Sequence, residues 1–514
     1  MNRRDDNYYD DRLQDIKLDE ITSSERNKDV LQKFHHGDPN LTNLLVDMRR
    51  EGDSDDESDD EDEIIFTTDY ELGTDDLGWL GFYIGRSEHL IKLNIFDLPY
   101  HPAELHDEQM DALTRGISRN RSIVELTIDH DIRDVGFRNM CNFVGENNNL
   151  RSLDLMHVKP ENESAQHFAL MLEQRQSKSL QRLALQDNDL GDEEIEAIAT
   201  ALSRQASLEE LVLMENDFGR LGCVALGTTL ERWQAPNLKQ LVLSYNNTDD
   251  AGLQALVAGL VNYINLEELQ LSYNHSITAV GLRSLAAFFQ SEHCCLEEFE
   301  MAGVYFGDEG AIALADGLVG NTSIESMTMY IDSIESTHFR TAPLITEVGW
   351  SAFSKLLCDT SSVNNNYVSN HTLTNISNNF LGHEQPPAIA QNYLELNRCA
   401  IDGVNVAMIK ILTHHPDLEM EPFFKWNLKC LPLAIRWFDM VRESPEELLE
   451  IREEQEVNPF PIHVNMAVEK LTTEELGSME CSAMYKFVRA MPMLVLNGFR
   501  GKERGSRKRK TRDR

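Results

Sequence analysis

Residues 180–188 (LQRLALQDN), 208–216 (LEELVLMEN), 238–246 (LKQLVLSYN) and 266–274 (LEELQLSYN) repeat one phrase, L-x-x-L-x-L-x-x-N. Its last two leucines alternate with polar or variable positions, as a β-strand with one buried face requires. The phrase is followed by helical spacing, as in residues 192–202 (DEEIEAIATAL), where acids occupy the first turn. The sequence therefore predicts one strand and one helix in each repeat of about 28 residues.

Weaker copies of the phrase extend the pattern in both directions. A parallel sheet inside and helices outside would then form an α/β horseshoe solenoid over residues 64–384, with about 9–11 repeats. A gap of 49 residues before Leu373 predicts a degenerate insertion near residues 331–370. The first apolar positions are Leu90, Ile123, Leu150, Leu180, Leu208, Leu238, Leu266, Leu296 and Ile324.

An asparagine ends each of the four best phrases, where the chain leaves the strand. Buried backbone groups need hydrogen-bond partners, and an asparagine side chain can bond the backbone of neighbouring turns. We therefore expect these asparagines to form a structural ladder along the solenoid. A small residue recurs about six places after the asparagine position, as Gly222, Gly252 and Gly310. The ladder consists of Asn188, Asn216, Asn246 and Asn274.

The phrases resemble the ribonuclease-inhibitor-like class of leucine-rich repeats, a likeness that implies the fold and says little about function. Residues 394–398 (LELNR), followed by helical sequence, are similar to the end of uncharacterised repeat proteins of unicellular algae. That second likeness implies architecture only. We expect residues 385–443 to form a helical cap, because the core of a terminal repeat needs shielding.

The flanking segments carry opposite charges. We expect residues 1–63 to be disordered, since residues 51–63 hold ten acids in thirteen positions. Ser54 and Ser58, each three residues before an acid, resemble sites of acid-directed casein-type kinases; the alternative is a solubilising spacer.

The carboxy-terminal flank divides into two parts. Residues 444–499 are predicted to be acidic and helical, and residues 500–514 to be a disordered basic tail. The run Arg507, Lys508, Arg509 and Lys510 resembles a nuclear-import signal; the alternative is a tail in transient contact with the acidic body.

The formal net charge of -40 disfavours nucleic acid and anionic membranes as partners, because like charges repel. The eight cysteines are scattered, and we find neither a secretory signal nor an apolar stretch long enough to cross a bilayer. We therefore expect a monomeric intracellular protein, cytoplasmic or nuclear or both.

The sequence carries no sign of catalysis. We find no Walker sequence, no H-E-x-x-H and no G-x-G-x-x-G after a predicted strand. His414 and His415 end a predicted helix, where a cation or a cap is the ordinary explanation. We expect a protein that is not an enzyme and has no cofactor and no metal.

Residues beside the core leucines should point to the concave face of the sheet. Acids recur there while bases are rare, and two tyrosines fall on adjacent turns. Such aromatic residues within a polar rim are typical of binding sites. The predicted partner-binding residues are Glu210, Met214, Glu215, Tyr245, Glu268, Gln270, Tyr273, Glu298 and Glu300.

The leading hypothesis is a scaffold that binds a basic protein partner on this face. The alternative is a regulator of a small GTPase, since Ran GTPase-activating proteins share the repeat class and an acidic segment. Their acidic segment follows the repeats, whereas here it precedes them. An innate-immunity receptor is disfavoured because no nucleotide-binding domain precedes the repeats.

Overall fold

The structure is a computed structural model that describes residues 6–13, 17–47, 69–71, 77–96, 107–232, 237–261, 263–329, 345–377, 386–399 and 403–415. The chain divides into two compact units. The first unit consists of residues 1–305 and 329–337, and the second unit consists of residues 306–328 and 338–514.

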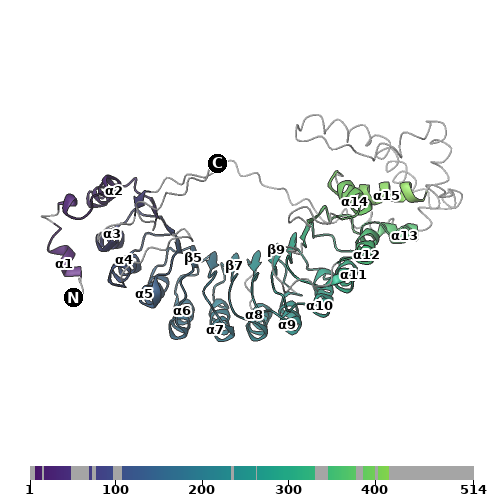
Figure 1. The fold of residues 1–514 in the computed structure, drawn as a ribbon, viewed down its shortest axis with the longest axis horizontal. Helices are drawn as coiled ribbons and strands as arrows, with labels where there is room; N and C mark the ends of the chain where they lie inside the picture. Colours follow the sequence, from purple (N-terminus) through teal and green to yellow (C-terminus); the bar gives the residue numbers. More distant parts are fainter. Residues whose placement is uncertain are drawn as a thin grey trace, which may run out of the picture. The chain divides into compact units, whose positions relative to one another are not determined.

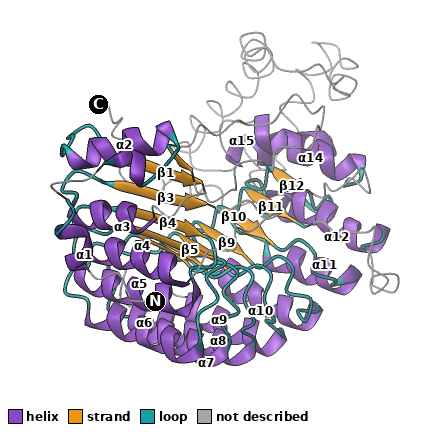
Figure 2. Ribbon diagram, turned by 60° about the vertical axis from the view of Figure 1, so that its left-hand side comes forward, coloured by secondary structure: helices purple, strands orange, loops and turns teal. Residues whose placement is uncertain are grey.

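The strands of the first unit lie side by side in one parallel sheet, in the order β10-β9-β8-β7-β6-β5-β4-β3-β1-β2 (Figure 2). Because each repeat carries the same phrase, Leu183, Leu211, Leu241 and Leu269 are in register across four strands. The strands are β1 (Asn43–Asp47), β2 (Tyr70–Glu71), β3 (Lys92–Phe96), β4 (Glu125–Asp129), β5 (Ser152–Met156), β6 (Arg182–Ala184), β7 (Glu210–Val212), β8 (Gln240–Val242), β9 (Glu268–Gln270) and β10 (Glu298–Glu300).

Helices cover one face of this sheet, and none of the described helices of this unit lies on the other face, which we call the open face (Figure 1). The leucines of the phrase and the apolar side of each helix form the core between them. This arrangement confirms the predicted leucine-rich-repeat fold. The helices are α1 (Asp6–Asp10), η1 (Leu18–Glu20), α2 (Glu25–His35), α3 (Leu77–Arg86), α4 (Asp107–Arg119), α5 (Arg133–Glu146), α6 (Asn162–Gln174), α7 (Asp192–Leu202), α8 (Arg220–Arg232), α9 (Asp250–Leu260) and α10 (Ala279–Phe289).

The prediction that residues 1–63 are disordered is wrong for residues 17–47. Ser24 caps α2 by accepting a hydrogen bond from the Asn27 amide, and Leu31 on this helix is fully buried. Strand β1 pairs with β3 through a five-residue parallel register, so the sheet begins before residue 64. The prediction failed because residues 43–47 (NLLVD) lack the full phrase. The acidic residues 51–63, with Ser54 and Ser58, lie outside the described residues.

The four asparagines at the ends of the phrases bond the backbone of adjacent turns. The Asn216 amide group donates to the carbonyl oxygens of Leu185 (2.8 Å) and Met214 (3.1 Å). Its Oδ1 accepts from the backbone amides of Asn188 and Leu190, both at 3.1 Å. Each asparagine thus satisfies backbone groups that the sheet leaves unpaired, and it does so on more than one turn.

An aspartate near the start of a helix holds the start of the next helix. Asp192 Oδ1 accepts a hydrogen bond from the Gly222 amide (2.7 Å), and Asp250 Oδ1 accepts from the Gly281 amide (2.9 Å). A Cβ atom on Gly281 would lie 2.5 Å from that same oxygen. At Gly281 the missing side chain therefore makes room for the aspartate of the preceding repeat.

The second unit contains two parallel strands in register, with Met327 opposite Ile376. The predicted insertion at residues 331–370 is partly wrong, because α12 is a regular repeat helix that packs on α11 and whose Gly349 amide bonds Asp308 (2.9 Å). The irregular spacing around residue 340 concealed this helix. The elements are α11 (Gly307–Gly317), β11 (Ser326–Thr328), α12 (Glu347–Leu357), α13 (Val363–Tyr367), β12 (Asn375–Ser377), α14 (Ala388–Cys399) and α15 (Gly403–His414).

Helices α14 and α15 lie within the predicted cap at residues 385–443, and α14 contacts α12. That they shield the last repeat stays a prediction. Residues 416–514 lie outside the described residues, and with them the predicted acidic segment at 444–499, the basic tail at 500–514 and its four-residue import signal.

Lys410 on α15 is a buried lysine whose ammonium group is surrounded by acceptors. Its Nζ donates to the carbonyl oxygens of Leu357 (2.6 Å) and Asn370 (3.2 Å) and to Asn397 Oδ1 (2.8 Å). His371 Nδ1 lies 3.1 Å from the same nitrogen. The side chain therefore connects α15 to the end of α12 and to α14.

The stability of the second unit is expected to rise with pH above neutrality because of Lys410. Burial lowers the pKa of this lysine to about 7, from an ordinary value of 10.5. Between these values the unfolded chain binds the extra proton, so the free energy of unfolding increases with pH, by up to a few kcal/mol. Below pH 7 both states hold the proton and the contribution is constant.

Urea unfolding followed by circular dichroism at pH 6.5, 8.0 and 9.5 measures this effect. Lys410→Met should flatten the rise, because it removes the titrating group. Equal pH dependence of the two proteins across this window would contradict the assignment.

Candidate functional site

The predicted partner-binding residues all lie in the first unit, on or beside β7, β8, β9 and β10. Glu210, Glu268, Gln270, Glu298 and Glu300 occupy the first or third positions of their strands, whose middle residues are buried against the helices. Alternation along a strand therefore places them on the open face. Met214, Glu215, Tyr245 and Tyr273 follow directly after β7, β8 and β9.

The acids on the amino-terminal strands of the open face have cationic partners. Lys92 Nζ lies 2.9 Å from Glu125 Oε2. Arg182 stands between Asp154 (3.0 Å) and Glu210 (2.5 Å). Glu210, predicted to bind a partner, is therefore already engaged in an ion pair.

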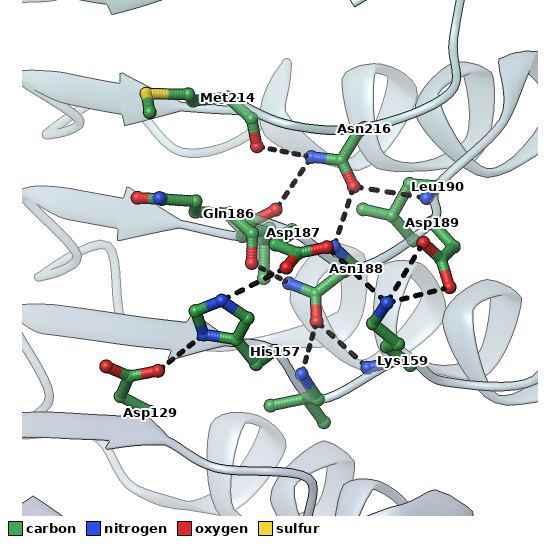
Figure 3. A network of polar contacts seen from close by, with 12 residues as sticks. Asp129, His157, Lys159, Gln186, Asp187, Asn188, Asp189, Leu190, Met214 and Asn216 are labelled. Atoms are coloured by element: carbon green, nitrogen blue, oxygen red, sulfur yellow. Dashed lines mark hydrogen bonds and ion pairs between the residues drawn. The ribbon is translucent and has the colours of Figure 1, made fainter. Parts of the chain in front are cut away.

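A second network continues this pattern at the ends of β4, β5 and β6 (Figure 3). His157 lies between two carboxylates, with Nδ1 2.5 Å from Asp129 and Nε2 3.0 Å from Asp187. Lys159 lies 3.6 Å from Asp187 and 3.5 Å from Asp189. Sequence reasoning missed His157 and Lys159. The sequence could have indicated His157, because it occupies the same position in its repeat as Asp187 and Tyr245 do in theirs.

The acids on β9 and β10 are different, because they face one another. Burial raises the pKa of Glu300, and the carboxylates of Glu268 and Glu298 raise it further. Gln270 Nε2 donates to Glu268 Oε1 at 2.5 Å. Within the described ranges, no lysine or arginine forms an ion pair with Glu268, Glu298 or Glu300. This part of the face therefore carries negative charge that the surrounding described residues leave uncompensated.

A small apolar strip lies on the open face across β6, β7 and β8. Ala184, Val212 and Val242 are in register on adjacent strands and pack together, with Met214 beside them. These three side chains are only 2–8% exposed, so the strip belongs to the packed sheet and offers little surface to a partner.

Four rings form a row along the loops that follow β8, β9 and β10. The Tyr245 and Tyr273 rings stack with centroids 4.0 Å apart and an interplanar angle of 13°. His275 lies edge-on to Tyr273 at 6.1 Å and stacks with Tyr305 at 6.0 Å. Tyr245 is 41% exposed. Sequence reasoning found the two stacked tyrosines and missed His275 and Tyr305, which lie outside the repeated phrase.

The two stacked tyrosines have left-handed backbone conformations, with φ of 56° for Tyr245 and 58° for Tyr273. Residues other than glycine rarely adopt this conformation, because Cβ crowds the following carbonyl group. The next repeat has Gly303 in the equivalent position, with φ of 68°. His157, Asp187 and Glu215 in the same repeat column are left-handed as well, so this conformation is a feature of the repeat turn. A glycine would adopt it without the contact of a Cβ atom.

Replacing Tyr245 with glycine is expected to destabilise the protein less than replacing it with alanine, by about 1 kcal/mol. Both variants lose the stacked pair, worth about 0.5–1.5 kcal/mol, but only glycine relieves the strain. Chemical denaturation of the two variants and the parent measures the difference. If Tyr245→Gly is the less stable variant, the position is unstrained.

The described residues offer neither a metal centre nor a membrane span. Among them, no three His, Cys, Asp or Glu side chains are grouped so as to hold a metal ion. In the same ranges, every helix is too short or too polar to cross a bilayer.

Comparisons with known proteins agree with this geometry. A family model described as "Leucine Rich repeat" matches residues 176–199, 234–257 and 264–286. The ribonuclease inhibitor of Sus scrofa is 34% identical over 192 residues, which cover 37% of this chain and 41% of the inhibitor. The match thus spans less than half the length of that relative.

Solved structures are more distant. The yeast complex of Rad7 and Elc1 matches with 16% identity and a TM-score of 0.30, covering 56% of this chain and 69% of that chain. An internalin of Listeria monocytogenes matches with 12% identity and a TM-score of 0.29, covering 64% and 93% respectively. The repeated phrase, the parallel register and the matched repeats show a leucine-rich-repeat fold, part of which is similar in sequence to ribonuclease inhibitor.

Proposed function

We propose that this chain is a non-enzymatic binding scaffold that holds a basic segment of a protein partner on the acidic–aromatic surface. That surface consists of Tyr245, Glu268, Tyr273, His275, Glu298, Glu300 and Tyr305. The observation that carries the proposal is the contrast between the two parts of the open face. The acids of β4 to β7 have cations beside them, whereas those of β9 and β10 face one another.

The chemistry of this surface suits arginine in particular. A guanidinium group can stack on a tyrosine ring and can also donate two hydrogen bonds to a carboxylate. Tyr273 packs against Gly303, which lies three residues beyond Glu300. An extended segment of the partner could therefore contact the tyrosine rings and the carboxylates together. The Sus scrofa relative is named as an inhibitor of a ribonuclease, and this supports a protein as the partner.

Fluorescence anisotropy with labelled twelve-residue peptides tests the proposal. We expect an alternating Arg–Gly peptide to bind more tightly than a Lys–Gly peptide, and a Glu–Gly peptide not to bind. Raising the salt from 50 to 300 mM should weaken the binding by roughly tenfold, because exposed charges are screened. Equal binding of the Arg–Gly and Glu–Gly peptides would refute the proposal.

The alternative function, regulation of a Ran-type GTPase, stays a prediction. A GTP-hydrolysis assay with such a GTPase and the purified chain tests it, and an unchanged hydrolysis rate would reject it.

A further inference from the structure

An open cavity of about 700 Å³ lies in the first unit, away from the acidic–aromatic surface. Its residues come from four successive turns in which a helix ends and a strand begins: α3 to β3, α4 to β4, α5 to β5 and, with Ser179 alone, α6 to β6. The residues of the aromatic row lie after the carboxyl ends of their strands, whereas the cavity residues lie before the amino ends of theirs. Because the strands are parallel, the two sites lie at opposite edges of the sheet. The lining residues that matter are Arg86, Arg119, Arg121, Arg151, Ser122 and Asn149.

The charge of this cavity is opposite to that of the protein. In the part of the chain that the structure describes, four of the five charged residues that line it are arginines, and Glu88 is the single acid. The whole chain has 87 acidic and 47 basic residues, so a random patch would be acidic. We call this site the arginine cavity.

The arginines can be reached by a ligand. Arg151 is exposed, and no carboxylate of the described residues forms an ion pair with it. Arg86 pairs with Asp10 and Arg121 pairs with Glu146, and the side chains in both pairs are 44–63% exposed. Exposed pairs of this kind are weak, so a ligand with higher charge density can replace the carboxylates.

The cavity lining restricts the chemistry of that ligand. Guanidinium groups bind phosphate through paired hydrogen bonds, and the volume falls within the range of small-molecule sites. Among the described residues, no aromatic side chain lines the cavity and Val124 is its only large apolar residue, so the lining favours neither a base nor a lipid chain. A long acidic polymer would be repelled by the net charge of -40, whereas a compact anion interacts mainly with charges within about 8 Å.

We propose that the arginine cavity binds a compact ligand bearing several phosphate groups. Such a ligand would connect three consecutive turns of the solenoid and would stabilise the first unit against unfolding. The phosphate groups could belong to a short free polyphosphate or to neighbouring phosphorylated side chains of another protein.

Calorimetric titration of the full chain with tripolyphosphate, with thermal unfolding in parallel, tests this proposal. We expect binding and a rise in unfolding temperature for the parent protein. Arg119→Gln/Arg151→Gln should weaken binding at least tenfold and remove the temperature shift. Arg204→Gln/Arg232→Gln, which removes two exposed arginines elsewhere in the first unit, should bind like the parent. Circular dichroism confirms that each variant is folded.

Two further measurements distinguish the possible sources of the phosphate groups. A peptide with two adjacent phosphoserines that competes with tripolyphosphate and binds more tightly would identify phosphorylated side chains, and tighter binding of tripolyphosphate would identify a free polyphosphate. Equal binding to all three proteins, or no binding at millimolar tripolyphosphate, would overturn the proposal. The Arg–Gly peptide should bind Arg119→Gln/Arg151→Gln unchanged, so the two proposed sites can fail separately.

Discussion

Combining Tyr245→Gly, Tyr273→Gly and Glu268→Gln is expected to weaken binding of the Arg–Gly peptide by roughly 100-fold or more. The two rings supply the stacking surface for guanidinium groups, and Glu268 supplies one of three carboxylates without a cationic partner among the described residues. Glycine suits the left-handed backbone at both tyrosines, so the variant should stay folded. Fluorescence anisotropy measures the affinity.

Two matched controls accompany this variant. Glu125→Gln removes the same charge from an acid that already pairs with Lys92, so it should change affinity only slightly. Tyr245→Phe/Tyr273→Phe keeps both rings and should retain most of the binding, because the ring face attracts the cation. If the triple variant binds the peptide as tightly as the parent, the acidic–aromatic surface is not the site.

Asn216→Ala is expected to destabilise the first unit by about 3 kcal/mol. The substitution leaves the amides of Asn188 and Leu190 and the carbonyl group of Leu185 without this partner, in the buried interior of adjacent turns. Each such orphaned group costs about 1–3 kcal/mol. Urea denaturation measures the loss.

Asn247→Ala is the control for this substitution. Asn247 is the next asparagine in the printed sequence after Asn246, but it is exposed and makes one side-chain bond, to the Asp217 carbonyl oxygen at 3.1 Å. Its replacement should cost less than about 1 kcal/mol. Similar losses for Asn216→Ala and Asn247→Ala would show that the ladder does not hold the turns together.

The regular part of the fold could be predicted because the interactions within each repeat are local. The leucines of one phrase determine both the strand and its buried face, and equal phrases then pair in register, as Leu211 does with Leu241. The recurring small residue was visible in the sequence, but the reason why a side chain would not fit there was not. The carboxylate that needs the space at Gly281 belongs to Asp250, a residue of the previous repeat.

The edges of the array could not be predicted in the same way. Strand β1 pairs with β3 although its sequence lacks the phrase, because the neighbouring strand supplies the hydrogen bonds. Asp308 accepts a hydrogen bond from the Gly349 amide near the start of helix α12, and the sequence periodicity gave no sign of this helix. In both places the tertiary partner, and not the local pattern, determines the element.

The candidate site was only partly accessible from the sequence. The alternation of strand residues placed Glu268 and Glu300 on one face, and the column just beyond the strands held Tyr245 and Tyr273. The repeat length then indicated which of these residues are neighbours in space. The pairing of Arg182 with two acids depends on side-chain geometry across adjacent strands, so sequence reasoning treated Glu210 as available. The arginine cavity was hidden because its arginines are spread over 66 residues of an acidic chain.

Photo-crosslinking of the Arg–Gly peptide tests the central claim most directly. The peptide carries a benzophenone group at its centre, and mass spectrometry of the digested complex identifies the attached residues of the full chain. We predict crosslinks within residues 240–305, around the aromatic row and the acids of β9 and β10. Crosslinks confined to residues 92–187 or to the outer faces of the helices would contradict the claim that this surface holds a basic segment.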